Sequence, residues 1–124
     1  MVLNAGMAGT PPVALNPTPR SRQYYRYVSP SEAYAVQTSN ITMTFSTTER
    51  TWYTPDRYAT RDEARRLLAL PGVPSHRVGP YPEDELPAWA VPLQRVQPNF
   101  GQPGGGWEAA TDEAAYVFGV LPLA

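Results

Sequence analysis

Glu108 has the most unusual setting of any acidic side chain in this sequence, because it follows a run of three glycines at residues 104–106 and Trp107. Three successive glycines are costly in backbone entropy, so either a ligand approaches their backbone closely or the loop moves. A phosphate-binding loop is one interpretation, but no Lys-Ser/Thr follows the glycines and no helical pattern begins there. A mobile surface loop between strands is the plainer alternative. In either case, the position of Glu108 is set by the glycine-rich segment that precedes it.

Arg26 is the second side chain whose setting suggests chemistry, because it lies inside an aromatic segment at residues 23–28. Aromatic and β-branched residues predict a strand there, in which Arg26 points to the face opposite Tyr25 and Tyr27. A guanidinium can bind a phosphate with two parallel hydrogen bonds, which suits arginine better than any other side chain. The structural alternative is an edge-strand arginine that reaches solvent or a carboxylate.

Composition bounds what the chain can do. Its 124 residues are enough for one domain, and 42% hydrophobic residues support a folded body, whereas 15 prolines and 9 glycines disfavour long helices. Ten basic residues, all arginine, balance 11 acidic residues, so no global field attracts nucleic acid or an anionic membrane. The absence of cysteine excludes disulfides and thiolate chemistry. We find no apolar run of membrane-spanning length and expect no export signal within the chain.

Local signals predict the elements that position these residues. Residues 1–20 are expected to be a Pro/Thr-rich linker or tail, and residues 21–124 the folded domain. Capping boxes at Ser29/Glu32 and Thr60/Glu63 predict two short helices, the first ending near residues 37–39 and the second at residues 71–72. Strands are expected at residues 23–28, 41–45, 51–54, 76–78 and 89–96. The apolar segment at residues 115–121 predicts the strongest strand, at the sheet centre, with the Glu108 loop at its start.

The run FGQPGGG at residues 100–106, one residue before Glu108, resembles the late signature of NAD-cleaving toxins of the tuberculosis necrotizing toxin type. In those enzymes a Gln holds the last place, whereas the ADP-ribosyltransferases, their relatives by fold, have a Glu there. The sequence Tyr-Arg-Tyr-Val-Ser at residues 25–29 resembles the first motif of ADP-ribosyltransferase toxins. The resemblance covers residues 22–124. It implies an α+β fold with an ADP-ribosyltransferase-like split, mostly antiparallel β body and two short helices.

The resemblance also implies roles for individual residues, with NAD as the substrate. Glu108 would hold the nicotinamide-ribose hydroxyl and stabilise a cationic transition state, and Arg26 would orient the dinucleotide. The residues expected to contact NAD are Arg26, Tyr27, Thr51, Tyr53, Thr54, Gln102 and Trp107. Trp52 is interpreted as a sheet aromatic. No metal is required; His76, the only histidine, has no cluster of ligands near it, which favours a structural role.

The function so implied is that of an NAD-consuming bacterial toxin domain. An ADP-ribosyltransferase that moves ADP-ribose to a macromolecular acceptor is favoured by Glu108, and an NAD glycohydrolase is the alternative. Arginine-modifying transferases usually have a second Glu or Gln where this chain has Gly106, which places an arginine acceptor in doubt. Rivals of another class are a metal-independent ribonuclease, which would need a basic cleft and a group such as His76, and a non-catalytic binding module.

The toxin resemblance extends to the expected partners. A toxin that consumes NAD would poison its producer, so we expect a cognate immunity protein, docked over the mouth between Arg26 and residues 104–108. We expect a monomer that does not bind membranes. Such a domain would be secreted or delivered as the C-terminal part of a larger effector and would act in the cytoplasm of the target cell.

Overall fold

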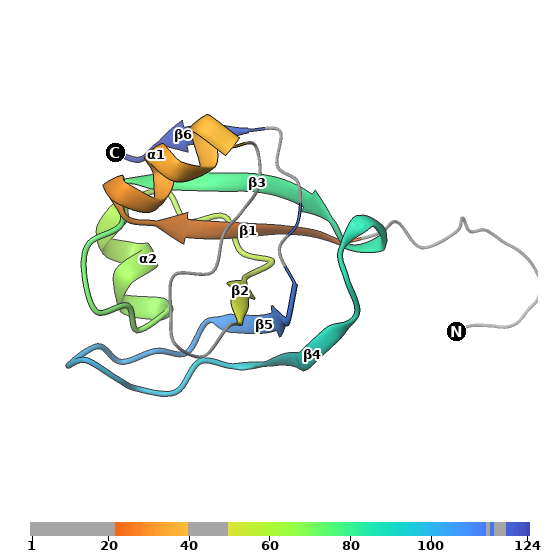
Figure 1. The fold of residues 1–124 in the computed structure, drawn as a ribbon. Coiled ribbons are helices and arrows are strands. Elements are labelled where there is room, and N and C mark those ends of the chain that lie inside the picture. Colours follow the sequence, from red (N-terminus) through yellow and green to blue (C-terminus); the bar gives the residue numbers. More distant parts are fainter. Residues whose placement is uncertain (1–21, 40–49, 114, 116–118) are drawn as a thin grey trace, which may run out of the picture.

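The structure is a computed structural model that describes residues 22–39, 50–113, 115 and 119–124. Within these residues six strands form two three-stranded antiparallel sheets, and the chain also has two α-helices (Figure 1). The predicted α+β fold with a split, mostly antiparallel β body and two short helices is therefore confirmed. The predicted linker at residues 1–20 and the predicted strand at residues 41–45 lie outside the described residues.

The first sheet has the strand order β1-β3-β6, with β1 at Gln23–Val28, β3 at His76–Pro82 and β6 at Val120–Pro122. The second has the order β2-β5-β4, with β2 at Thr51–Tyr53, β5 at Trp107–Thr111 and β4 at Trp89–Arg95. The proline-interrupted strand β4 lies at an edge, as predicted, because proline lacks a donor for the sheet ladder.

One isolated bridge joins the two sheets. Tyr25 N donates to Thr54 O at 2.8 Å, and Thr54 N donates to Tyr25 O at 2.9 Å. The strand that carries Arg26 is thereby held beside Thr54, the residue that follows β2. This bridge is the reason why residues from two separate sheets can face one common space.

The two helices form where their caps predict them. In α1, Pro30–Ser39, Ser29 Oγ accepts a hydrogen bond from Glu32 N at 3.3 Å. In α2, Arg61–Leu67, Thr60 Oγ1 accepts one from Glu63 N at 3.2 Å. Each bond satisfies a backbone donor that the first turn of a helix leaves without a partner.

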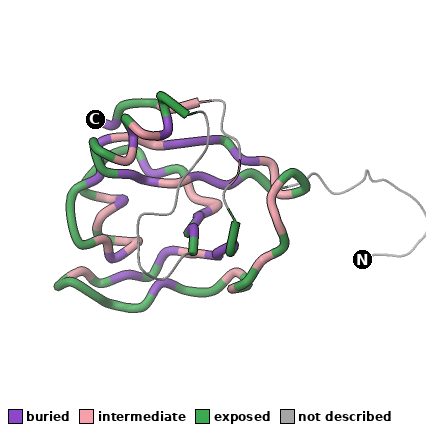
Figure 2. The backbone as a smooth tube through the Cα atoms, viewed as in Figure 1, coloured by how far each residue is buried: buried purple, intermediate pink, exposed green. Residues whose placement is uncertain are grey.

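Strand β1 contributes to two cores because its side chains alternate between its faces. On one face, Tyr24 and Val28 pack with buried residues of α1, β2 and β3. On the other face, Tyr25 and Tyr27 form a second cluster with Tyr58, Ala64 and Leu123, and this cluster includes α2. Figure 2 shows the resulting buried stretches along β1 and β3.

The predicted central strand at residues 115–121 lies partly outside the described residues, which do not include 116–118. The described end of that segment belongs to β6, Val120–Pro122, which lies at the edge of the first sheet rather than at a sheet centre, with Leu121 exposed. β5 is the central strand of the second sheet, and it carries Glu108 itself. The fully buried Ala109 and Ala110 fit between two neighbouring strands. Strand propensity reports local fit to an extended backbone and not which strand gains two neighbours.

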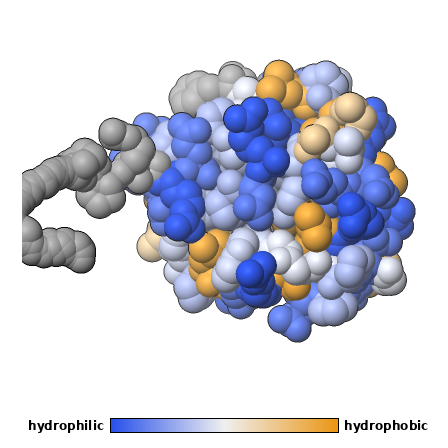
Figure 3. All heavy atoms as spheres, turned by 180° about the vertical axis from the view of Figure 1, so that it is seen from behind, coloured by the Kyte–Doolittle hydropathy of each residue, from blue (hydrophilic) through white to orange (hydrophobic). Residues whose placement is uncertain are grey.

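The face opposite to that in Figure 1 is mainly hydrophilic, with small, separate groups of apolar residues (Figure 3). In the part of the chain that is described, no helix is long and apolar enough to cross a membrane.

Candidate functional site

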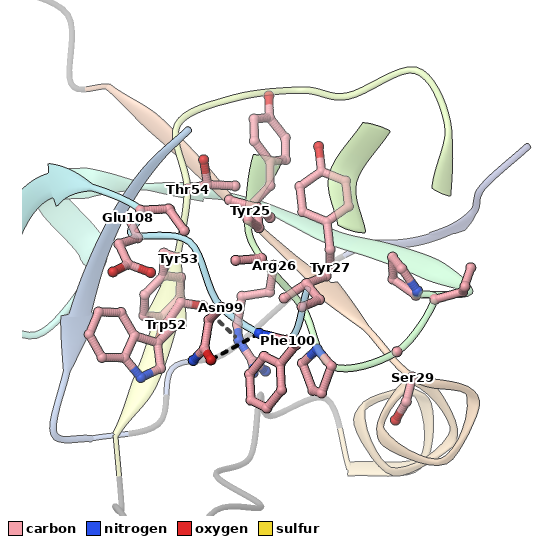
Figure 4. A pocket seen from close by; sticks show the side chains of 18 of the residues that line it. Tyr25, Arg26, Tyr27, Ser29, Trp52, Tyr53, Thr54, Asn99, Phe100 and Glu108 are labelled. Carbon is pink, nitrogen blue, oxygen red and sulfur yellow. Dashed lines mark hydrogen bonds between the residues drawn. The ribbon is translucent and has the colours of Figure 1, made fainter. Parts of the chain in front are cut away.

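A cavity of about 620 Å³ opens between β1, the second sheet and two loops, a volume typical of small-molecule sites (Figure 4). One loop follows α2 at residues 68–74, and the other follows β4 at residues 96–100. Five residues predicted from the sequence line it: Arg26, Tyr27, Tyr53, Thr54 and Glu108. The structure therefore brings both predicted catalytic residues to one space.

Glu108 lines the cavity from β5, opposite Gln94 of the neighbouring strand β4. Gln94 Nε2 donates a hydrogen bond to Glu108 Oε2 at 3.1 Å. Burial raises the pKa of Glu108 above its usual range, and the Gln94 hydrogen bond partly offsets this by favouring the charged form. A half-buried carboxylate of this kind can stabilise positive charge more strongly than one in bulk water.

Arg26 lines the cavity from β1 and is also paired with protein groups. Its Nε donates to Trp52 O at 3.0 Å, and its guanidinium forms an ion pair with Glu32 of α1 at 2.5 Å. The Arg26 and Glu32 side chains are only 12% and 15% exposed. Arg26 therefore reaches a carboxylate, which is the structural alternative predicted from the sequence, and it also lines the cavity.

Two buried tyrosines are among the residues that line the cavity, and both are anchored by contacts elsewhere. The Tyr27 hydroxyl donates to Asp56 O at 2.9 Å and accepts from Tyr58 N at 2.7 Å. Tyr53 is fully buried and meets the Tyr81 ring edge-on, with centroids 5.0 Å apart. Burial raises the pKa of Tyr27 and of Tyr53, so both hydroxyls stay neutral near physiological pH.

Three residues predicted to contact NAD are not among those that line the cavity: Thr51, Gln102 and Trp107. Thr51 is fully buried and pairs with Thr111 on β5. Trp107 lies beneath the guanidinium of Arg95, which is 4.1 Å from its ring centroid. Gln102 closes a turn with Asn99 through backbone hydrogen bonds of 2.8 and 3.1 Å.

The glycine run packs against the end of α2. Gly104 N donates to Arg66 O at 2.9 Å, and Gly106 N donates to Leu67 O at 3.0 Å. A Cβ atom on Gly104 would lie 2.6 Å from Val96 O, and one on Gly106 would collide with the Tyr58 hydroxyl. Close approach to other protein atoms, backbone at position 104 and the Tyr58 hydroxyl with Leu67 O at position 106, thus accounts for glycine at both positions.

Sequence reasoning missed several residues of the site. Glu32 had a local signal, but only as a helix cap, and its pairing with Arg26 depends on where α1 docks. Gln94 had none, because its contact with Glu108 follows from the register of β4 and β5. Phe100, at the rim, appeared only as part of a motif. His76 is not among the cavity-lining residues; its Nδ1 lies 2.7 Å from Ser75 Oγ.

Metal binding gains no support from the described ranges, which contain no group of three or more His, Asp and Glu residues close enough to hold an ion. The charged side chains that line the cavity are one arginine and two carboxylates, and several aromatic rings line it beside them.

No family model matches the chain, and no curated protein matches it. Among solved structures, the chain is similar to Tne2 in the structure of Tne2 in complex with Tni2, with a TM-score of 0.57 and 19% sequence identity. The similarity covers 86% of this chain and 90% of the other. At this identity the match shows that the two chains share a fold.

Proposed function

We propose that this chain is an NAD-consuming toxin domain that breaks the bond between nicotinamide and ribose. The observation that carries the proposal is the meeting of Arg26 and Glu108, which come from different sheets, in one cavity of about 620 Å³. The aromatic residues Tyr27 and Tyr53 line the same cavity. Phosphates, a ribose and flat rings are the parts of NAD that such groups bind.

In the proposed reaction the C–N bond breaks, the electron pair leaves with nicotinamide, and the ribose acquires oxocarbenium character. The Glu108 carboxylate holds the ribose hydroxyl and stabilises the positive charge electrostatically. Partial burial strengthens that interaction, because less water screens it. Arg26 acts on the diphosphate, and its ion pair with Glu32 keeps the guanidinium in place.

We favour transfer of ADP-ribose to a macromolecular acceptor over hydrolysis, because a glutamate holds position 108. Gln94, on the neighbouring strand, adds a neutral amide beside that carboxylate. An NAD glycohydrolase, in which water is the acceptor, remains the second candidate, supported by the FGQPGGG run. A ribonuclease is disfavoured because His76 does not line the cavity.

The direct test is incubation of the purified chain with NAD, with free nicotinamide measured by chromatography. Glu108→Gln keeps size and hydrogen bonding but removes the charge, so turnover should fall about a hundred- to a thousandfold. The matched control is Glu85→Gln, which neutralises an exposed carboxylate in the 3₁₀ turn at Glu83–Glu85. Absence of nicotinamide release, or full activity of Glu108→Gln, would contradict the proposal.

A second assay separates the two reaction types. Labelled NAD is incubated with the chain and a bacterial lysate, and label in macromolecules is compared with free ADP-ribose. Transfer to macromolecules supports the transferase, whereas ADP-ribose alone supports the glycohydrolase.

The proposal includes a cognate immunity protein that covers the cavity mouth. The shared fold with Tne2, which was solved in complex with Tni2, supports a dedicated partner chain. Delivery as part of a larger effector into a target-cell cytoplasm belongs to the same proposal. Expression of the chain in a bacterial cytosol should arrest growth, Glu108→Gln should relieve the arrest, and Glu85→Gln should not. Unaffected growth with the intact chain would contradict the toxin role.

A further inference from the structure

Phe100 is a large apolar side chain with little protein contact at the rim of the cavity. It is 57% exposed, and its ring is one of the cavity-lining side chains (Figure 4). Trp52 and Val73, from two other segments, are also exposed and line the same cavity. Single apolar residues scattered on a surface need no explanation, but a gathering around one opening indicates a binding surface.

The backbone at Phe100 is strained. Asn99 and Gln102 exchange two backbone hydrogen bonds across a tight turn, in which Phe100 has φ 52° and Gly101 has φ 73°. Positive φ at both central positions is typical of primed turns, which favour asparagine or glycine at the first of them. A bulky residue with φ above zero is an outlier, and Phe100 gains little packing in return for it.

The strain is localised to the cavity. Among the residues that the structure describes, the other non-glycine residue with positive φ is Ala69, at 51°, and it too lines the cavity. Strained conformations cluster at ligand-binding sites, where they hold a side chain in a position that binding requires. Asn99 Oδ1 accepts a hydrogen bond from Phe100 N at 2.9 Å, which fixes the turn and hence the direction of the ring.

We infer that Phe100 is a ligand-binding residue whose ring stacks on a planar heteroaromatic ring held in the cavity. This inference rests on the proposed function and specifies it, because NAD has two such rings, adenine and nicotinamide. Stacking would remove the exposed Phe100 surface from water, and aromatic faces bind nitrogen heterocycles well. The exposed Phe100 ring is then explained by the ligand that covers it.

The test compares Phe100→Gly with wild type in both stability and NAD turnover. Glycine tolerates φ 52° without strain, so the melting temperature should rise by a few degrees. The KM for NAD should rise about tenfold, with a much smaller change in kcat, since the lost contact is with the bound ring. Phe100→Tyr keeps the ring and should restore the wild-type KM. Tyr34→Ala removes a 70% exposed aromatic that does not line the cavity and should change neither KM nor kcat.

Two partial ligands identify the ring, with binding measured by calorimetry on Glu108→Gln and on Glu108→Gln combined with Phe100→Gly. ADP-ribose carries adenine alone, and nicotinamide mononucleotide carries nicotinamide alone. Weaker binding of one of them in the double variant assigns the ring that Phe100 covers and supports the inference.

Failure of the inference is distinguishable from failure of the proposed function. If wild type releases nicotinamide and Phe100→Gly leaves both the KM and the affinities unchanged, the stacking role is wrong while the function stands. A lower melting temperature for Phe100→Gly would show that the ring packs structurally, which also overturns the inference. If wild type neither binds nor cleaves NAD, both the stacking role and the proposed function are wrong.

Discussion

Gln94 and Glu108 face each other across β4 and β5, where Gln94 Nε2 donates a hydrogen bond to Glu108 Oε2 at 3.1 Å. Burial raises the pKa of Glu108, and this bond opposes the rise. The register of β4 and β5 places Gln94 beside Glu108, and the resulting hydrogen bond favours the charged form of the proposed catalytic group. Its consequences can be measured in activity and in stability.

Gln94→Leu should shift the acidic limb of the pH–activity profile to higher pH. The variant removes the donor that favours the carboxylate, so the pKa of Glu108 rises further and protonation begins at higher pH. At pH values well above that pKa, the carboxylate is ionised in both proteins and activity should approach wild type. Gln37→Leu, an exposed change on α1, is the control. An acidic limb that stays in place would mean that the bond does not control the charge.

Glu108→Gln should stabilise the folded protein near neutral pH, although it lowers turnover. A carboxyl group whose folded pKa is raised contributes stability that is present below its unfolded pKa and is lost as pH rises through the folded value. Glutamine has no charge to bury, so its advantage in the free energy of unfolding should appear near pH 8 and vanish near about pH 4. Urea denaturation at both pH values measures this, with Glu85→Gln as control. Equal pH dependence in wild type and Glu108→Gln would contradict it.

Glu32→Gln should destabilise the fold by about 3 kcal/mol, because it leaves the Arg26 guanidinium largely buried without its carboxylate. The double variant Arg26→Met/Glu32→Leu should lose less stability than the sum of the two single changes, since no charge then remains buried. Asp112→Asn breaks the exposed ion pair with Arg50 and should cost less than about 1 kcal/mol. Chemical denaturation of each variant, with Arg26→Met and Glu32→Leu as the two single changes, gives these values. Equal costs for Glu32→Gln and Asp112→Asn would mean that the Arg26 pair behaves as a surface contact.

Gly106→Ala should destabilise by about 2 kcal/mol or more, because the new methyl group meets the Tyr58 hydroxyl and Leu67 O. Gly104→Ala introduces a similar clash at a position whose φ of 69° is unfavourable for alanine. Gly72→Ala, where no atom lies within 4 Å of the added carbon, is the control. Thermal melting measures the loss. If positions 104 and 106 tolerate alanine as well as position 72 does, the glycine run does not serve close packing against α2.

The sequence alone determined the local parts of this protein. The caps at Ser29 and Thr60 predicted both helices, because a cap is a contact between a side chain and a backbone donor three residues away. The aromatic strand β1 was predicted within its observed bounds, and the edge position of β4 followed from its proline. Arg26 and Glu108 could be selected as candidates because their neighbours made them unusual.

Only the tertiary structure decided how those local parts are arranged and which of them touch. The central place of β5 and the bond from Gln94 to Glu108 depend on how separate strands pair. The ion pair between Arg26 and Glu32 depends on how α1 docks beside β1. Propensity and periodicity describe single segments, and they carry no information on which strand gains two neighbours or which helix covers which face. The cavity itself is such a product, because the bridge between Tyr25 and Thr54 places two sheets around it, and no local pattern encodes that bridge.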